Sequence, residues 1–126
     1  LIMTLSLTLG AAAQQSDIQG TIQSQFDAFK ADDFETAFTF ATPRLQQLFQ
    51  NPQNFQQMVT RGYPMVWKWG AVTFLDLRDL GAEWVQIVEV EDAGGGVHLL
   101  AYRMVETPEG WRIGGVQILD APGVAA

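Results

Sequence analysis

The spacing of hydrophobic residues changes once along the chain, from a helical period to an extended one. In the first half, apolar residues recur at intervals of three or four, which places them on one face of a helix. From about residue 63 onward, short runs rich in Val, Ile, Leu and aromatic residues are separated by turn residues instead. The pattern therefore predicts helices first and strands afterwards. The clearest helical stripe consists of Ile18, Ile22, Phe26 and Phe29.

Residues suited to capping divide the helical half into segments. They predict helices at about 16–30, 34–40 and 44–50, and a fourth from residue 52 up to the stop at Gly62 and Pro64. The caps are Ser16 in the capping box Ser16-Asp17-Ile18-Gln19, Asp32 or Asp33, Thr42 before Pro43, and Asn51 before Pro52.

The second half predicts an antiparallel sheet. We expect four main strands, at about 71–78, 83–91, 97–106 and 111–119, with 65–68 as an additional short strand. The turns between them are short enough to make neighbouring strands antiparallel. Gly114 and Gly115 inside the last strand indicate a bulge or bend. The expected fold class is α+β, with helices packed on one face of a curved sheet.

Residues 1–13 form a short apolar run that ends in three alanines, a pattern typical of a secretory signal peptide. A membrane span needs about 20 apolar residues, so an anchor is the weaker interpretation. The run begins with Leu and lacks a basic residue, so we expect its start to be incomplete. We expect a periplasmic or secreted protein with one domain at 14–126. A buried apolar helix or strand is the alternative interpretation of residues 1–13.

Composition excludes several classes of function. With 48% hydrophobic and 17% charged residues, the chain is suited to a packed domain. It contains no cysteine, which excludes a disulfide framework, a thiol nucleophile, Cys-ligated zinc and lipidation of a lipoprotein Cys. The net charge of −7 disfavours nucleic acid and anionic membrane surfaces as partners.

Three stretches carry a resemblance to a known superfamily. With the order of elements above, the chain resembles the cone-shaped fold of nuclear transport factor two and its SnoaL-like relatives. More narrowly, it is similar to a bacterial family of small exported domains of unknown function. The stretches are residues 26–33, residues 55–67 with their Gly62-Tyr63-Pro64 segment, and residues 110–113. Members of that family commonly follow Gly-Tyr-Pro with a basic residue and proline, whereas this chain has Lys68-Trp69-Gly70.

The resemblance implies a cone whose open end can form a pocket. In that superfamily the same cavity serves as an enzyme site, a ligand site or a protein interface, and the fold alone does not choose among them. It implies no established activity.

The residues suited to catalysis do not form a recognisable motif. His98 is the only histidine, and as a general base it would need a carboxylate such as Asp76 within hydrogen-bond reach in the cavity. The acidic groups fit helix caps and a solvated strand face better than a calcium loop. Residues 94–96 form a turn rather than a phosphate cradle. We therefore predict no catalytic residue, no metal and no cofactor.

Aromatic residues provide the best candidate site. We predict that Tyr63, Trp67 and Tyr102 line a pocket for an apolar molecule bearing an acidic group, with Arg61 or Arg103 at its rim. The alternative is that these aromatic residues are part of the core, as is usual in a small domain. Trp67 and Trp69 share a face if that stretch is extended.

Three functions from different classes remain open. The leading one is a non-enzymatic domain that binds a small apolar or amphipathic ligand in its cone. The second is a protein-interaction module that forms a homodimer or docks on an envelope protein. The third is a cone-fold isomerase, dehydratase or hydrolase, which requires His98 and a carboxylate to converge.

Overall fold

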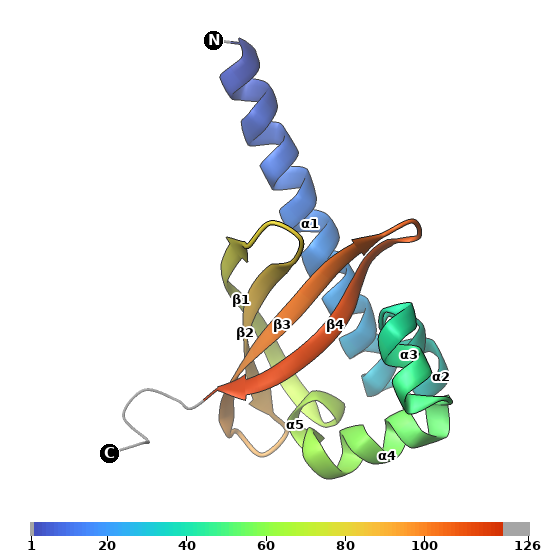
Figure 1. Cartoon of the computed structure of the whole chain (residues 1–126). Coiled ribbons are helices and arrows are strands. Elements are labelled where there is room, and N and C mark those ends of the chain that lie inside the picture. The colour runs from blue at the N-terminus through green and yellow to red at the C-terminus, as the bar shows by residue number, and fades with distance from the viewer. Residues whose placement is uncertain (1, 120–126) are drawn as a thin grey trace.

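The computed structural model describes the backbone of residues 2–119 and the side chains of residues 10–119. Most of the predicted signal peptide at 1–13, and the end of the predicted domain at 120–126, lie outside the described side chains. Five helices precede four strands in this part of the chain (Figure 1). The helices are α1 (Ile2–Lys30), α2 (Phe34–Thr39), α3 (Pro43–Phe49), α4 (Pro52–Gly62) and α5 (Pro64–Trp67). The strands are β1 (Trp69–Asp79), β2 (Trp84–Asp92), β3 (Val97–Thr107) and β4 (Gly110–Leu119).

Helix α1 is much longer than the sequence pattern predicts. It runs without interruption from Ile2 to Lys30, so the predicted start at Ser16 is wrong. Residues 2–15 are rich in Leu and Ala and contain no proline, so the helix continues through the capping box. The side chains of residues 10–13 are exposed, and the first turns of α1 project beyond the sheet in Figure 1.

The next three helices begin at the predicted caps. The side chains of Asp33, Thr42 and Asn51 each accept a hydrogen bond from the backbone N–H three residues later. The additional strand predicted at 65–68 is wrong, because this segment forms the single turn α5. Pro64 occupies the first helical position, where its fixed φ favours a helix and its missing N–H costs nothing.

The four strands form one antiparallel sheet in the order β1-β2-β3-β4. Their predicted positions are confirmed to within about two residues at each end. The predicted irregularity at Gly114 and Gly115 is also confirmed, because Arg103 pairs with Gly115 and Met104 with Ile113, which leaves Gly114 as the extra residue of a bulge.

All five helices cover the same face of the sheet, which confirms the predicted α+β class. Alternate strand residues point into this layer, and Val88, Leu100 and Tyr102 are all at most 1% exposed. Phe26 of α1 packs at the centre, with its ring centroid 5.7 Å from that of Trp69 and 6.1 Å from that of Tyr102. The core therefore lies between α1 and the sheet, and α2 to α5 close its remaining sides (Figure 1).

Buried Gln86 fixes a second bulge, in β1. Its amide nitrogen donates to the carbonyl oxygens of Leu75 and Asp76 at 3.0 and 3.2 Å, and its side-chain oxygen accepts from Gln19 at 3.2 Å. The β1 register shifts at this point, between Phe74 and Leu77. The carbonyls that leave the ladder are thus paired inside the core.

Candidate functional site

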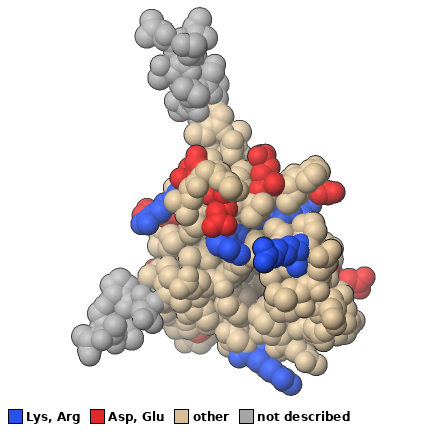
Figure 2. Space-filling model, viewed as in Figure 1, with Lys and Arg blue, Asp and Glu red and all other residues tan. Residues whose placement is uncertain are grey.

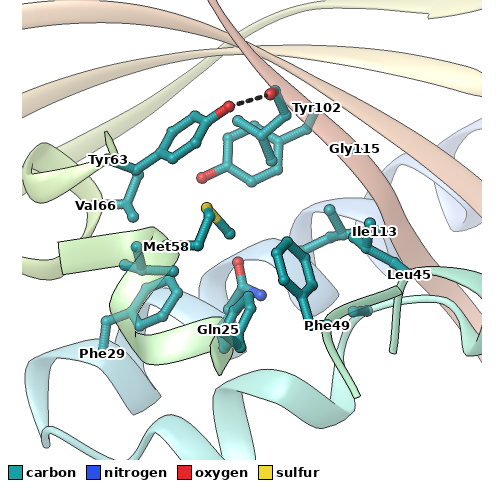
Figure 3. Close-up of a pocket in the computed structure, with 14 residues that line it drawn as sticks. Gln25, Phe29, Leu45, Phe49, Met58, Tyr63, Val66, Tyr102, Ile113 and Gly115 are labelled. Carbon is teal, nitrogen blue, oxygen red and sulfur yellow. Dashed lines mark hydrogen bonds between the residues drawn. The ribbon is translucent and has the colours of Figure 1, made fainter. Parts of the chain in front are cut away.

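A cavity of about 270 Å³ lies between the helices and the β4 side of the sheet (Figure 3). Helices α1, α3, α4 and α5 contribute to its wall, and so do strands β3 and β4. The turns beside α3 and α4 complete it. Most lining side chains are aliphatic or aromatic, and they include Phe29, Leu45, Phe49, Phe55, Met58, Val59, Val66 and Ile113. The wall contains no Asp, Glu, His, Lys or Arg among the described residues.

The cavity opens where α3 separates from the edge strand β4. Up to Thr42 the chain runs beside β4, and the Thr42 N–H donates to the Ile113 carbonyl at 2.9 Å. Pro43 has no N–H and begins α3, so the pairing cannot continue. Lining residues on either side of this gap are only half buried; they are Leu45, Phe49, Met58, Tyr63, Gly115 and Val116.

Two polar atoms point into this apolar space. Figure 3 shows the hydroxyl of Tyr102 and the side-chain oxygen of Gln25 directed between the surrounding apolar side chains. Tyr102 is 1% exposed and Gln25 is 5% exposed. No hydrogen bond joins either oxygen to another described residue, whereas the Gln25 amide nitrogen donates to the Ala37 carbonyl at 3.1 Å. Among the described residues no fully buried side-chain oxygen or nitrogen lacks a partner, so both oxygens are accessible from the cavity. Both oxygens can therefore bond to a molecule inside the cavity.

Burial holds the Tyr102 phenol in its neutral form. Loss of hydration raises the pKa of Tyr102 well above its ordinary value of 10.0, and the neighbouring Tyr63 raises it further. The hydroxyl can thus donate or accept a hydrogen bond, but it does not act as a base near neutral pH.

Only part of the predicted aromatic site lies at the cavity. Tyr63 and Tyr102 line it, whereas Trp67 does not. Helix α5 turns Trp67 toward the connection between α1 and α2. There its indole N–H donates to Asp32 at 2.7 Å and its ring packs against Phe34. The alternative prediction, that these aromatic residues belong to the core, fits Trp67 better.

Neither predicted arginine lines the cavity. Arg61 is an exposed residue in the last turn of α4. Arg103 projects from the opposite face of β3, where its guanidinium donates to the Gly114 carbonyl at 2.6 Å. It lies over Gly115, because a Cβ atom at Gly115 would come within 2.9 Å of the guanidinium. Arg103 therefore lies just outside the β4 side of the cavity.

The predicted pairing of His98 with Asp76 does not occur. His98 Nε2 lies 2.7 Å from Asp92 Oδ2, in the connection between β2 and β3. His98 pairs in the sheet with Val90, whereas Asp76 lies in the bulge opposite Gln86. Four residues along β2 correspond to about 13 Å. A carboxylate does converge with His98, but it is that of Asp92, and neither residue lines the cavity.

Three residues that line the cavity were not predicted from the sequence. They are Gln25 of α1 and Leu45 and Phe49 of α3. Gln25 had a usable signal, since it lies three residues after Ile22 and four before Phe29, within the apolar stripe of α1. A polar residue at such a position faces either a buried partner or a cavity. The α3 residues carried no comparable signal.

In residues 2–119 no helix is long and apolar enough to cross a membrane.

Residues 11–126 match the model of a family described as "Domain of unknown function (DUF4864)", so the chain belongs to this family. No match was found among curated proteins.

Solved structures with a similar fold include two described as NTF-2-like proteins of unknown function. The one from Shewanella oneidensis has 13% sequence identity and a TM-score of 0.56, covering 84% of this chain and 98% of its own. The one from Burkholderia xenovorans has 13% identity and a TM-score of 0.50, covering 87% and 91%. These matches confirm the NTF-2-like fold.

A third similar structure is described as a phospholipid-binding protein from Ralstonia solanacearum in complex with a phospholipid. It has 17% identity and a TM-score of 0.50, and the match covers 83% of this chain and 77% of that protein.

Proposed function

We propose that this member of the DUF4864 family is a non-enzymatic domain that binds a small apolar or amphipathic ligand in the cavity beneath β4. The observation that carries the proposal is a pair of oxygens, on the buried residues Tyr102 and Gln25, that point into an otherwise apolar cavity and form no hydrogen bond to another described residue. Apolar walls with a few placed polar groups are typical of ligand sites.

The cavity volume sets the size of the ligand. An apolar cavity of about 150 Å³ holds benzene, which has six carbon atoms. Scaled in proportion, the 270 Å³ observed here accommodates about ten carbon atoms. The enclosed part of the ligand is thus a short alkyl chain or a small ring system, with a larger molecule extending through the mouth.

The chemistry of the wall supports binding rather than catalysis. No acidic, basic or imidazole side chain faces the cavity from the described part of the chain. The one titratable group that is fully buried there, Tyr102, stays protonated because burial raises its pKa. The wall can orient a hydroxyl or carbonyl group of a ligand, and it supplies no general base.

The phospholipid-binding protein from Ralstonia solanacearum supports the same proposal by fold analogy. Its description pairs this fold with a bound lipid. The analogy gives no position for a ligand in this chain, which is inferred from the cavity alone.

Calorimetric titration with straight-chain alcohols, from butan-1-ol to dodecan-1-ol, tests the proposal. Each added methylene is expected to raise the affinity about fourfold while it is buried. The increase should stop near ten carbon atoms, when the cavity is full. A chain-length series distinguishes an enclosed site from weak adsorption to the surface, which shows no such limit.

A matched pair of variants locates the site. Val59→Phe places a larger side chain in the cavity wall, because Val59 is 3% exposed and lines the cavity. Val97→Phe makes the same change on an exposed position of β3 and leaves the cavity unchanged. The proposal predicts that Val59→Phe abolishes alcohol binding and that Val97→Phe binds like the parent. Equal binding by both variants, or no binding of any alcohol by the folded parent, contradicts it.

We further propose that the domain acts outside the cytoplasm. The apolar composition of residues 1–13 and the exposure of side chains 10–13 support export after removal of this segment. Fusion of the chain to a reporter enzyme that is active only in an oxidising compartment tests this, with a fusion lacking residues 1–13 as the control.

A further inference from the structure

A groove of about 540 Å³ adjoins the mouth of the cavity on its outer side. Leu45 lines both hollows, and the neighbouring residues Gly114 and Gly115 of β4 line the groove and the cavity, respectively. The cavity and the groove therefore lie next to one another at the gap between α3 and β4. A molecule that fills the cavity and emerges at the gap enters the groove.

The groove is basic, in contrast to the cavity. Arg44 of α3 and Arg103 of β3 line it together with Thr42 and Gln47, and none of the described lining residues is acidic. Figure 2 shows basic side chains gathered near the centre of the face over β3, β4 and α3. In a chain with a net charge of −7, this grouping is local. Charges farther away than about 8–10 Å are largely screened at physiological ionic strength, so a ligand in the groove senses mainly the two arginines and Glu83, which lies 3.8 Å from Arg103.

Both arginines have donors free for a ligand. Arg44 makes no hydrogen bond or ion pair with another described residue. Arg103 donates one hydrogen bond, to the Gly114 carbonyl, and its guanidinium lies 3.8 Å from Glu83 in an exposed pair. Exposed pairs of this kind contribute little, and a guanidinium has five N–H groups. The Gly114 contact holds Arg103 against β4, so part of the ordering cost of binding is already met.

We infer that the ligand is a single-chain amphiphile whose anionic head group is held in this groove by Arg44 and Arg103 while its tail occupies the cavity. The inference rests on the proposed function and adds the charge and position of the head group. Guanidinium groups bind carboxylates and phosphates through paired, charge-assisted hydrogen bonds, so either head group suits the groove.

The test compares ligands that share a ten-carbon chain and differ only in the head group. Decan-1-ol, undecanoate and decyl phosphate are titrated below their micellar concentrations, with inorganic phosphate as a fourth ligand. The two anionic amphiphiles are expected to bind about tenfold more tightly than decan-1-ol, a typical gain for charge-assisted hydrogen bonds. Undecanoate and decyl phosphate, which share a ten-carbon alkyl chain, distinguish a carboxylate from a phosphate head group. Inorganic phosphate alone is expected to bind at least a hundredfold more weakly than decyl phosphate.

Three charge-removing variants locate the head group. Arg44→Gln and Arg103→Gln are expected to remove most of the tenfold advantage of the anions and to leave decan-1-ol binding unchanged. Arg61→Gln is the matched control, because it removes the same charge from an exposed residue outside both hollows. Arg44 has no hydrogen bond or ion pair to another described residue, so its replacement is expected to leave folding intact.

Two different failures are distinguishable. Equal affinity for decan-1-ol and the anions, an equal loss in all three variants, or inorganic phosphate as strong as decyl phosphate overturns the inference and leaves the cavity proposal standing. Failure of decan-1-ol and both anions to bind overturns the proposed function as well.

Discussion

The hydroxyl of Tyr63, at the end of α4, donates a hydrogen bond to the carbonyl oxygen of Val116 in β4 over a distance of 2.9 Å (Figure 3). The two residues are 53 positions apart in the sequence and lie on opposite sides of the cavity mouth. This contact joins the helical layer to an edge strand that has no further strand beside it in the described sheet. It therefore links the two sides of the opening.

Replacement of Tyr63 by Phe is expected to loosen the mouth. The Val116 carbonyl loses its donor but can turn to solvent at this half-buried position, so we expect a loss of about 1 kcal/mol in the free energy of unfolding. For a domain of this size the melting temperature should fall by about 4 °C. Ligand dissociation should become faster, because the opening is no longer tied. An unchanged melting temperature together with an unchanged dissociation rate would contradict this role.

Replacement of Tyr102 by Phe also removes a tyrosine hydroxyl. Unlike the Tyr63 variant, it is expected to lower ligand affinity and to leave stability nearly unchanged. Its hydroxyl has no partner among the described residues, so the free energy of unfolding should change by less than about 0.5 kcal/mol. Affinity for butan-1-ol, which is short enough to lie wholly inside the cavity, should fall about tenfold, because its hydroxyl loses the Tyr102 partner. Chemical unfolding and calorimetric titration measure the two effects. A stability loss as large as that of the Tyr63 variant argues against a free hydroxyl.

Tyr102 should also make stability depend on pH in the alkaline range. Burial raises its pKa in the folded protein, so the unfolded chain loses this proton first as the pH rises above about 10. The stabilisation is complete below that pH and is lost above it, since deprotonation then favours the unfolded state. Unfolding of the parent and of Tyr102→Phe at pH 8 and pH 10.5 tests this. The parent should lose more stability than the variant, and parallel losses would contradict the prediction.

Asp92 gives a second pH dependence, at the acidic end. Its carboxylate accepts hydrogen bonds from His98 Nε2 at 2.7 Å and from the backbone N–H groups of Gly96 and Gly94, both at 2.9 Å. These contacts, with that of His98 the largest, lower the pKa of Asp92 below its ordinary value of 3.8. The unfolded chain therefore takes up the proton first, and stability present above pH 3.8 is lost as the pH falls further.

Melting curves between pH 6 and pH 2.5 test the Asp92 prediction. The variant Asp92→Asn should have a lower melting temperature than the parent at pH 6 and a shallower decline below pH 4. Glu91→Gln is the control, because Glu91 is an exposed neighbour with the same type of charge. A decline equally steep in Asp92→Asn and the parent would rule out this turn as a source of acid sensitivity.

Thr42 is expected to stabilise the domain by capping the start of α3. Its side chain caps the helix by accepting from the Leu45 N–H at 3.2 Å, at the point where the chain leaves β4. Thr42→Ala should cost about 1 kcal/mol of unfolding free energy. Thr42→Ser, which keeps the capping oxygen, should retain most of the stability. Because α3 carries Leu45, Phe49 and Arg44, amide exchange in this helix should accelerate in the alanine variant, and uniform acceleration over all elements would contradict a local effect.

The parts of the fold that were predicted correctly are mostly determined by residues close to one another in the sequence. The caps Asp33, Thr42 and Asn51 act within four residues of the helix that they start, so they are visible in the sequence. The capping box at Ser16 misleads for the same reason. It is locally correct, but the preceding residues are themselves strong helix formers, and α1 continues through it.

The site depends on contacts that no local pattern contains. Trp67 lies outside the predicted pocket, where its indole N–H donates a hydrogen bond to Asp32, which is 35 residues away in the sequence. His98 in β3 pairs with Asp92 at the end of β2, across the short connection between the two strands, and not with Asp76. The position of Asp76 in β1 depends on the bulge at Gln86. Arg103 was predicted at the rim, but strand alternation puts it on the outer face of β3, where it lies over Gly115, which has no side chain. Such placements follow from packing between elements.

The most direct test of ligand binding follows the methionine methyl groups by NMR during titration with decan-1-ol. The chain contains four methionines. Met58 lines the cavity, whereas Met65 and Met104 are buried elsewhere and serve as internal references. The account predicts a saturable shift of the Met58 methyl signal, small changes at Met65 and Met104, and no Met58 shift in Val59→Phe. A Met58 signal that stays fixed, or one that moves no more than that of Met104, would contradict it.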